Sequence, residues 1–214
     1  MSDNSFKTPV ERFGIRKRPT QSRSRSTVDS IRQAALLVFQ EDGADACTTQ
    51  AIATKAGVSI GSLYQYFPNG GAIFASIYEE VCLAIAMTLK SQIPDAHRSS
   101  VYEVQVNFLR ILLDIYDRDQ TVLIDLVQAM PELRLEEQPC SIHAMAQGSI
   151  RAYLIQKVDG LTEDDLERMT FFVTHLLRDT VKSYVIDGHE RIEREAFIHD
   201  LSSIVAAYIE RRLG

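Results

Sequence analysis

The sequence predicts an all-α protein of about nine helices, in which a small N-terminal module precedes a larger helical body. Three observations lead to this class. Apolar residues recur at helical spacing along most of the chain. Alternating strand patterns bounded by hairpin turns are not found. A chain of 214 residues with 45% hydrophobic content can also bury a sizeable core.

The N-terminal arm is the basic end of an otherwise acidic chain. Residues 1–24 are rich in Ser, Arg, Pro and Lys and are expected to be flexible. Residues 1–32 contain eight basic and three acidic residues, whereas the other 182 contain 15 basic and 26 acidic ones. This polarity suits a protein that meets a polyanion at one end only, although a solvated tail is the other interpretation of the charge. The candidate contact residues in the arm are Arg16, Lys17, Arg18, Arg23 and Arg25.

Three helices are expected to form the N-terminal module. The first begins near Thr27 and ends before Gly43, because glycine takes the left-handed conformation that follows many helices. A short second helix with a threonine N-cap covers about 49–55. Ser59 is the expected cap of a third helix, which extends to about Phe67.

The rest of the chain is expected to remain helical. The stretch Pro68-Asn69-Gly70-Gly71 has the composition of a turn, and a long helix follows it through about Lys90. Beyond this helix, proline, glycine or charged residues separate segments whose apolar residues share one face. These segments are 101–117, 120–130, 138–157, 163–186 and 191–212.

The most informative stretch is residues 48–67, TTQAIATKAGVSIGSLYQYF. Gly57 allows an abrupt reversal between the second and third helices, and Ala53 and Ala56 are small enough for these helices to cross closely. This pattern is typical of a helix-turn-helix, whose second helix lies in the DNA major groove and meets base edges with its N-terminal residues. The residues expected to fill and close the small core beneath are Ile52, Val58, Leu63 and Phe67.

The third predicted helix combines small residues with aromatic rings. Gly61 and Ser62 let its start approach a duplex closely, and free N–H groups there favour a phosphate. Tyr64 and Tyr66 are two residues apart and therefore lie on different faces, but either hydroxyl can donate to a phosphate oxygen. Gln65 can read adenine through paired hydrogen bonds.

The order of these segments resembles the DNA-binding domain of TetR-type transcriptional regulators. The resemblance covers about 26–85, from IRQAALLVFQEDG through TTQAIATKAGVSIGSLYQYFPN to the long helix. It implies backbone contacts from the two threonines, groove-facing residues at the start of the third helix, and a phosphate contact from Tyr66. The candidate DNA-binding residues are Thr48, Thr49, Ser59, Ile60, Gly61, Ser62, Tyr64, Gln65 and Tyr66.

One departure from the family pattern concerns Gly70 and Gly71. Family members usually carry a lysine and a glutamate here, and the lysine commonly binds a phosphate at the start of the fourth helix. Its loss predicts a somewhat weaker and less salt-sensitive complex with DNA. Paired glycines are also expected to loosen the joint between two domains. The basic arm can compensate by entering the adjacent minor groove.

The resemblance also implies two domains and a homodimer. Residues 25–71 would be the helix-turn-helix DNA-binding domain, and residues 72–214 would be a helical-bundle domain for ligand binding and dimerisation. The last two long helices would form a four-helix interface, although their apolar stripes also suit ordinary core packing. Two recognition helices related by a two-fold axis can read a palindromic operator, whereas a single one reads too few base pairs to be selective.

A small-molecule effector is expected to bind among the middle helices, at about 85–180, and to alter the separation of the two recognition helices. Polar residues between apolar ones, together with adaptable methionines, are candidates for the lining of its site. An ordinary core or surface role is the alternative for each of them. The candidates are Met87, Asn107, Phe108, Met130, His143, Gln147 and His175.

The expected function is that of a ligand-responsive repressor of double-stranded operator DNA. An activator, an effector-independent regulator or an adaptor with a degenerate DNA-binding domain is compatible with the same features. A helical-bundle enzyme would need convergent carboxylates, a Glu-x-x-His pair or an activated nucleophile, and none is found in the sequence.

Neither a cofactor nor a metal site is expected, because three isolated cysteines and five histidines lack ligand spacing. No stretch approaches the roughly 18 apolar residues of a membrane span, so no membrane partner is expected. An apolar signal-peptide core is also lacking at the N-terminus, and a cytoplasmic location is therefore expected.

Overall fold

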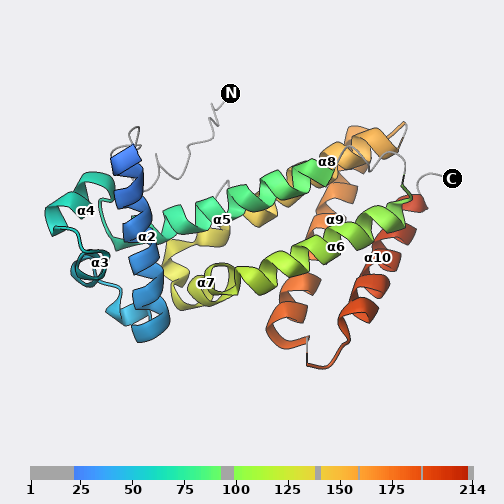
Figure 1. The fold of residues 1–214 in the computed structure, drawn as a ribbon. Helices are drawn as coiled ribbons and strands as arrows, with labels where there is room; N and C mark the ends of the chain where they lie inside the picture. Colours follow the sequence, from blue (N-terminus) through green and yellow to red (C-terminus); the bar gives the residue numbers. More distant parts are fainter. Residues whose placement is uncertain (1–21, 93–98, 138–140, 159, 189, 212–214) are drawn as a thin grey trace. The chain divides into compact units, whose positions relative to one another are not determined.

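The computed structural model describes residues 22–92, 99–137, 141–158, 160–188 and 190–211, which form helices and their connections (Figure 1). No strand occurs among these residues, and the predicted all-α class is confirmed. The chain divides into two compact units. Unit 1 contains the described residues up to Leu83 together with Thr121–Ser141, and unit 2 contains Ala84–Gln120 together with the described residues from Ile142 onward.

Unit 1 is built around α2 (Ser22–Asp42), α3 (Thr49–Ala56), α4 (Ile60–Tyr66) and the first part of α5 (Gly70–Gln92). The short helix α3 packs on both α2 and α4, and Figure 1 shows α3 and α4 beside α2. The shorter elements of this unit are the 3-10 turn Ala44–Ala46, the π-helical turn Thr121–Asp125, α7 (Leu126–Ala129), and the 3-10 turns Pro131–Leu133 and Leu135–Glu137.

Apolar side chains from α2, α3, α4 and α5 form the core of unit 1. The rings of Phe39 and Phe74 join α2 to α5 by an edge-to-face contact, with centroids 6.3 Å apart. Arg32 adds a polar link between the same helices, because it donates to Ser76 Oγ at 3.0 Å and to a carboxylate oxygen of Glu80 at 2.7 Å. Other buried members of this core are Ile31, Val38, Ile52, Leu63 and Phe67.

Some element boundaries differ from the sequence expectations. α2 begins at Ser22 rather than near Thr27. Residues 22–26 carry no apolar side chain, so periodicity could not detect this turn, although serine and arginine are tolerated in helices. The segment expected as a helix over 120–130 is a π-helical turn followed by the short α7.

Gly70 and Gly71 lie in the first turn of α5, and not in a turn before it as expected. The reason is the side chain of Asn69, whose Oδ1 accepts a hydrogen bond from the N–H of Ala72 at 2.9 Å. An asparagine in this position satisfies a free donor of the helix start and allows the helix to begin one residue later.

α5 contains a long apolar segment, which begins in unit 1 and continues into unit 2. Gly70–Thr88 is long and apolar enough to cross a membrane by length and composition alone, with a mean hydropathy of 1.4 over 19 residues. The sequence reading did not identify such a stretch. Half of this window is buried inside the protein, where Ile73, Phe74 and Ile77 belong to the core. The composition is therefore that of a core helix.

The described part of unit 2 contains α6 (Val101–Arg118), α8 (Ile142–Lys157), α9 (Glu163–Ser183) and α10 (Arg194–Glu210), besides the end of α5. A π-helical turn, Tyr184–Gly188, follows α9. α6 packs against α10, α8 against α9, and α9 against α10. Their inward faces form one apolar cluster, which we call the unit 2 core; it includes Leu109, Leu154, Met169, Val173 and Val205.

Ion pairs join α6 to α10 at the surface of unit 2. Arg110 donates to Glu195 at 2.6 Å. Arg194 donates to Asp117 at 2.6 Å and also pairs with Asp114. Because these groups are largely exposed, each pair adds little stability, and the apolar contacts beneath them hold the two helices together.

Candidate nucleic-acid interface

A threonine cap fixes the N-terminus of α3. Thr48 has an extended backbone, and its side chain accepts a hydrogen bond from the N–H of Ala51 at 3.1 Å. Thr48 is exposed and Thr49 is half-buried, so both stand at the solvent-facing start of α3. A phosphate is favoured at such a place, because free N–H groups and the helix dipole both attract negative charge.

Gly57 makes the turn between α3 and α4, as predicted. Its φ of 68° lies in the left-handed region, which glycine enters without steric cost. Its N–H donates to the carbonyl of Thr54 at 3.1 Å, and the N–H of Val58 donates to the carbonyl of Ala53 at 3.0 Å. These bonds satisfy the last carbonyls of α3 and direct the chain into α4.

The small core beneath the turn contains the residues that the sequence predicted for it. Ile52 and Leu63 are fully buried, and Val58 is half-buried. Phe67 is 1% exposed, which agrees with a structural role for this ring at the end of α4. Since these side chains face inward, the rest of α4 is left to present an outer surface.

Ser59 caps α4, as predicted. Its Oγ accepts a hydrogen bond from the N–H of Ser62 at 3.0 Å and lies 2.8 Å from the Oγ of Ser62. Gly61 is exposed, and a Cβ added there would meet only Ser59 Oγ, at 3.9 Å. The protein itself therefore leaves room for a side chain at position 61.

The outer face of α4 presents Tyr64 and Gln65, with Ile60 and Tyr66 half-buried beside them. Tyr64 is 41% exposed, and its hydroxyl lies 3.1 Å from the Oγ1 of Thr49. The sequence reading missed this contact between the two helices. No local pattern could reveal it, because it depends on the angle at which α3 and α4 cross.

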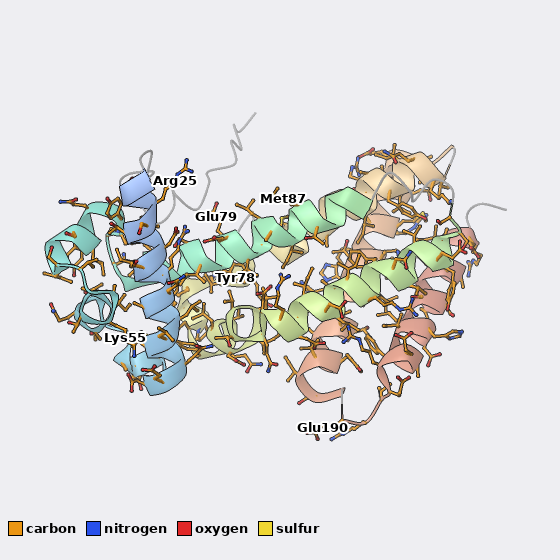
Figure 2. The ribbon with its side chains drawn as sticks, viewed as in Figure 1. Arg25, Lys55, Tyr78, Glu79, Met87 and Glu190 are labelled. Atoms are coloured by element: carbon orange, nitrogen blue, oxygen red, sulfur yellow. The ribbon has the colours of Figure 1, made fainter. Side chains whose placement is uncertain are left out.

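The basic residues proposed for the arm are described only in part. Arg16, Lys17 and Arg18 lie outside the described residues, as does the side chain of Arg23. Arg25 is exposed near the start of α2 (Figure 2). A further cation, Lys55 of α3, forms an ion pair with Glu41 of α2 at 2.5 Å (Figure 2).

At the start of α5, Gly71 has a packing role. A Cβ added to it would come within 2.8 Å of the Cδ2 of Leu133, so that side chain would have to move. Leu133 belongs to the 3-10 turn Pro131–Leu133, which lies in unit 1 with the start of α5. The glycine therefore permits a close contact between α5 and this turn.

The residues predicted to line an effector site belong to several elements of the two units. Met87 is 75% exposed on α5 (Figure 2), and Asn107 and Gln147 are exposed. Phe108 packs against the unit 2 core, whereas Met130 is buried in unit 1.

Of the two predicted histidines, His175 is half-buried with its ring centroid 4.3 Å from that of Phe171. The side chain of His143 lies outside the described residues. Contact of any of these residues with an effector stays a prediction. Within the described ranges, no three His, Cys, Asp or Glu side chains gather in a way that could hold a metal ion.

Comparison with known proteins connects this geometry to a family. Residues 31–77 match the family described as bacterial regulatory proteins, tetR family. No curated protein matches the chain in sequence. Similar solved structures include a TetR-family transcriptional regulator, itself described as putative, from Mesorhizobium loti (19% identity, TM-score 0.60, covering 90% of this chain and 98% of that one).

Two regulators named FadR have a similar fold. FadR from Bacillus halodurans is 19% identical, with a TM-score of 0.60, and the match covers 89% of this chain and 97% of that one. FadR from Bacillus subtilis, solved with stearoyl-CoA, is 18% identical, with a TM-score of 0.62 and coverage of 84% and 97%. At such low identity these likenesses show the fold alone.

The matched residues 31–77 include all of α3 and α4, the turn at Gly57, most of α2 and the start of α5. Regulators of the TetR family act by binding DNA and are not enzymes, which agrees with the predicted class. The N-terminal segment 31–77 therefore matches the tetR family of bacterial regulatory proteins, and the chain has the fold of solved TetR-family transcriptional regulators.

Proposed function

We propose that the chain is a sequence-specific DNA-binding repressor, which a small-molecule effector releases from a palindromic operator. The observation that carries this proposal is the exposed start of α4. Gly61 has room for a side chain within the protein, so its smallness suits a partner that approaches from outside. Duplex DNA is such a partner, because the first residues of a recognition helix meet base edges in the major groove.

The roles of the surrounding side chains follow from their positions. The hydroxyls of Thr49 and Tyr64 are already 3.1 Å apart, so both can bond to the same phosphate of the DNA backbone. Thr48 and Tyr66 contact neighbouring phosphates. Gln65, exposed on α4, reads a base through its amide.

An exposed apolar face on α9 and α10 supports a homodimer. Phe171 and Phe172 are 53% and 54% exposed, and Ile204 is 56% exposed. The ring of Phe172 contacts that of Tyr208, with centroids 6.1 Å apart, which joins the two helices into one surface. Grouped exposed aromatic and aliphatic side chains are typical of protein interfaces. The two-fold partner places a second α4 for the other half of the operator.

A small-molecule effector and a cytoplasmic location complete the proposal. The FadR structures from Bacillus subtilis and Thermus thermophilus are complexes with stearoyl-CoA and lauroyl-CoA. They support the idea that a small molecule also binds to the helical body of this chain. A repressor must also share a compartment with its operator.

The deciding experiment combines the pure full-length chain with DNA from upstream of its own gene. We expect retardation that weakens with added salt, and release of the DNA by a metabolite extract. Transcription from the bound promoter falls for a repressor and rises for an activator. Equal retardation of a scrambled duplex would contradict sequence-specific binding.

A variant of Gly61 tests directly whether the exposed start of α4 approaches DNA. Gly61→Leu should leave the Tm nearly unchanged, because a Cβ there meets only one atom of the protein, at 3.9 Å. It should weaken DNA binding by at least about tenfold, because the side chain blocks close approach to the groove. Gly148→Leu, at an open helical position on α8, is the matched control and should bind DNA normally.

A further inference from the structure

Five buried polar atoms of unit 2 have no hydrogen-bond partner among the described residues. They are Gln105 Oε1, Tyr153 Oη, Thr170 Oγ1, Thr174 Oγ1 and Ser202 Oγ. Buried polar groups are normally paired, because an unpaired one loses its bonds to water without replacement. These atoms therefore indicate a partner that the described residues do not supply.

Two of these atoms lie one helical turn apart on the inward face of α9. Thr170 and Thr174 are 3% and 2% exposed, and they alternate with Met169 and Val173 of the unit 2 core. A buried threonine within a helix often bonds to the carbonyl one turn earlier. Neither hydroxyl does so here, and neither has another hydrogen-bond partner in the part of the chain that the structure describes.

Tyr153 brings a third hydroxyl from α8, the helix that packs on α9. Its ring packs against the unit 2 core. Burial raises the pKa of Tyr153 to about 12, with a smaller contribution from the nearby Glu210. The hydroxyl therefore stays protonated at neutral pH and can donate a hydrogen bond.

The other two atoms come from α6 and α10, which also pack together. Gln105 is 5% exposed and Ser202 is fully buried. The rings of Tyr102 and His199, one turn away on each helix, are in contact with centroids 5.8 Å apart. These two helices run antiparallel, because Arg110 of α6 pairs with Glu195 at the start of α10. Gln105 and Ser202 therefore lie on opposite sides of the ring contact, and their apolar neighbours belong to the same unit 2 core.

The buried interior offers no charge. No Lys, Arg, Asp or Glu is among the buried residues of the described chain. A charged group placed there would lose its hydration and find no counter-ion. The hydroxyls and the amide oxygen can instead bond to a neutral polar group without that cost.

We propose that the hydroxyls of Thr170, Thr174 and Tyr153 are the hydrogen-bonding groups of an effector site inside unit 2, and that this site selects an uncharged amphiphile. Such a compound has an apolar body, which the unit 2 core holds, and an amide, hydroxyl or carbonyl group, which bonds to Thr170, Thr174 and Tyr153. The inference rests on the effector response proposed above and specifies its ligand class. Charged ligands, including coenzyme A thioesters, are selected against by the uncharged interior.

Two matched pairs of probes test the ligand class, and the measured quantity is the Tm of the full chain with each probe. The chain is first refolded from guanidinium, which removes co-purified compounds. The pairs are dodecanamide with dodecanoate and 4-phenylbenzamide with 4-phenylbenzoate, and lauroyl-CoA is a fifth probe. At least one amide should raise the Tm more than its carboxylate and more than lauroyl-CoA. A larger shift with the charged probes, or no shift with any probe, overturns the proposal.

The double variant Thr170→Val, Thr174→Val separates a binding role from a structural one. Valine keeps the shape of threonine and removes only the hydroxyl. The Tm without a probe should stay level or rise by up to about 2–4 °C, because two unpaired buried groups are lost. Affinity for the amide should fall about tenfold, the effect of losing one or two hydrogen bonds.

Thr180→Val, a half-buried position on the same helix, is the matched control and should keep full affinity for the amide. A lower Tm of the double variant, or an unchanged affinity, would overturn the proposal, since the hydroxyls would then have partners in the protein. DNA retardation is measured separately on the same samples. If the chain retards DNA but does not respond to the amides, the proposed effector site is wrong and the proposed DNA-binding function stands. If the chain binds an amide but does not retard DNA, the DNA-binding function is wrong and the ligand site stands.

Discussion

Side-chain hydroxyls make most of the polar contacts at the starts of α3 and α4. Thr48 and Ser59 are caps, and Thr49 pairs with Tyr64 across the two helices. These groups are suited to phosphates, which they can contact in any sequence. Gln65 differs from them because its exposed amide can form two bonds with the edge of one base.

This division of roles predicts different DNA-binding profiles for two variants. Gln65→Ala should relax base preference at one operator position and cost about 1–3 kcal/mol there. Tyr66→Phe should weaken binding to all sequences alike, because a phosphate contact carries no sequence information. Fluorescence anisotropy with the operator and its single-base variants measures both effects. Gln128→Ala, exposed on α7, is the control, and identical profiles for the first two variants would contradict the division.

The turn glycine gives a prediction for stability. Gly57→Ala should destabilise the protein by about 1–2 kcal/mol, because a φ of 68° is unfavourable for a residue with a Cβ. Gly148→Ala, inside α8 and without a positive φ, should instead stabilise it by about 0.5–1 kcal/mol. Thermal unfolding of both variants measures the difference. A Tm for Gly57→Ala at or above that of the unmodified chain would show that the turn is not constrained.

At the scale of elements, the start of α6 shows how a helix in unit 2 is held. Ser100 Oγ accepts a hydrogen bond from the N–H of Glu103 at 3.2 Å, and Glu103 Oε2 accepts one from the N–H of Ser100 at 2.9 Å. This reciprocal capping box satisfies two donors of the helix start. The backbone bond from Ser100, and then the bond from its hydroxyl, hold the pKa of Glu103 below its ordinary value of 4.5.

The lowered pKa makes the contribution of this cap dependent on pH. Because the folded pKa lies below the unfolded one, the contribution is complete above about pH 4.5 and is lost as the pH falls through the folded pKa. Glu103→Gln keeps the capping geometry without the charge, so its Tm should lie below that of the unmodified chain at pH 7. The difference should shrink in acid. Thermal unfolding between pH 7 and acid measures this difference in Tm, and Glu167→Gln on the exposed face of α9 is the control. A difference that stays constant with pH would contradict the prediction.

At the scale of the whole molecule, α9 has two apolar faces. Met169, Val173 and Leu177 point into the unit 2 core. Phe171 and Phe172 are on the outside. A helix in a monomer needs only the first of these faces, so the second favours association with another copy of the chain.

Negative charge introduced on the outer face should therefore separate the subunits. The double variant Phe172→Glu, Ile204→Glu should be monomeric by analytical ultracentrifugation, because buried carboxylates would be unpaired in the interface. Its affinity for a palindromic operator should fall by roughly 100-fold or more, since the two half-sites would no longer be bound by one particle. Ile155→Glu, at an equally exposed position on α8, is the control. A variant that stays dimeric would place the interface elsewhere.

Local patterns determined much of this protein from the sequence alone. Apolar periodicity, the caps at Thr48 and Ser59, and the left-handed Gly57 all act within a few residues, so they can be recognised without tertiary contacts. The same information identified the helix-turn-helix and the residues on its outer face. It failed at Ser22 and Gly70, where a helix begins without an apolar signal.

Only the tertiary structure decided which groups meet across distant parts of the chain. It paired Thr49 with Tyr64, brought Leu133 against Gly71, and assigned one face of α9 to the core and the other to solvent. It also placed the hydroxyls of Thr170 and Thr174 on an inward face of α9. The physical reason is that burial and hydrogen-bond partners depend on how helices pack, and a residue's own neighbours in sequence do not encode that packing.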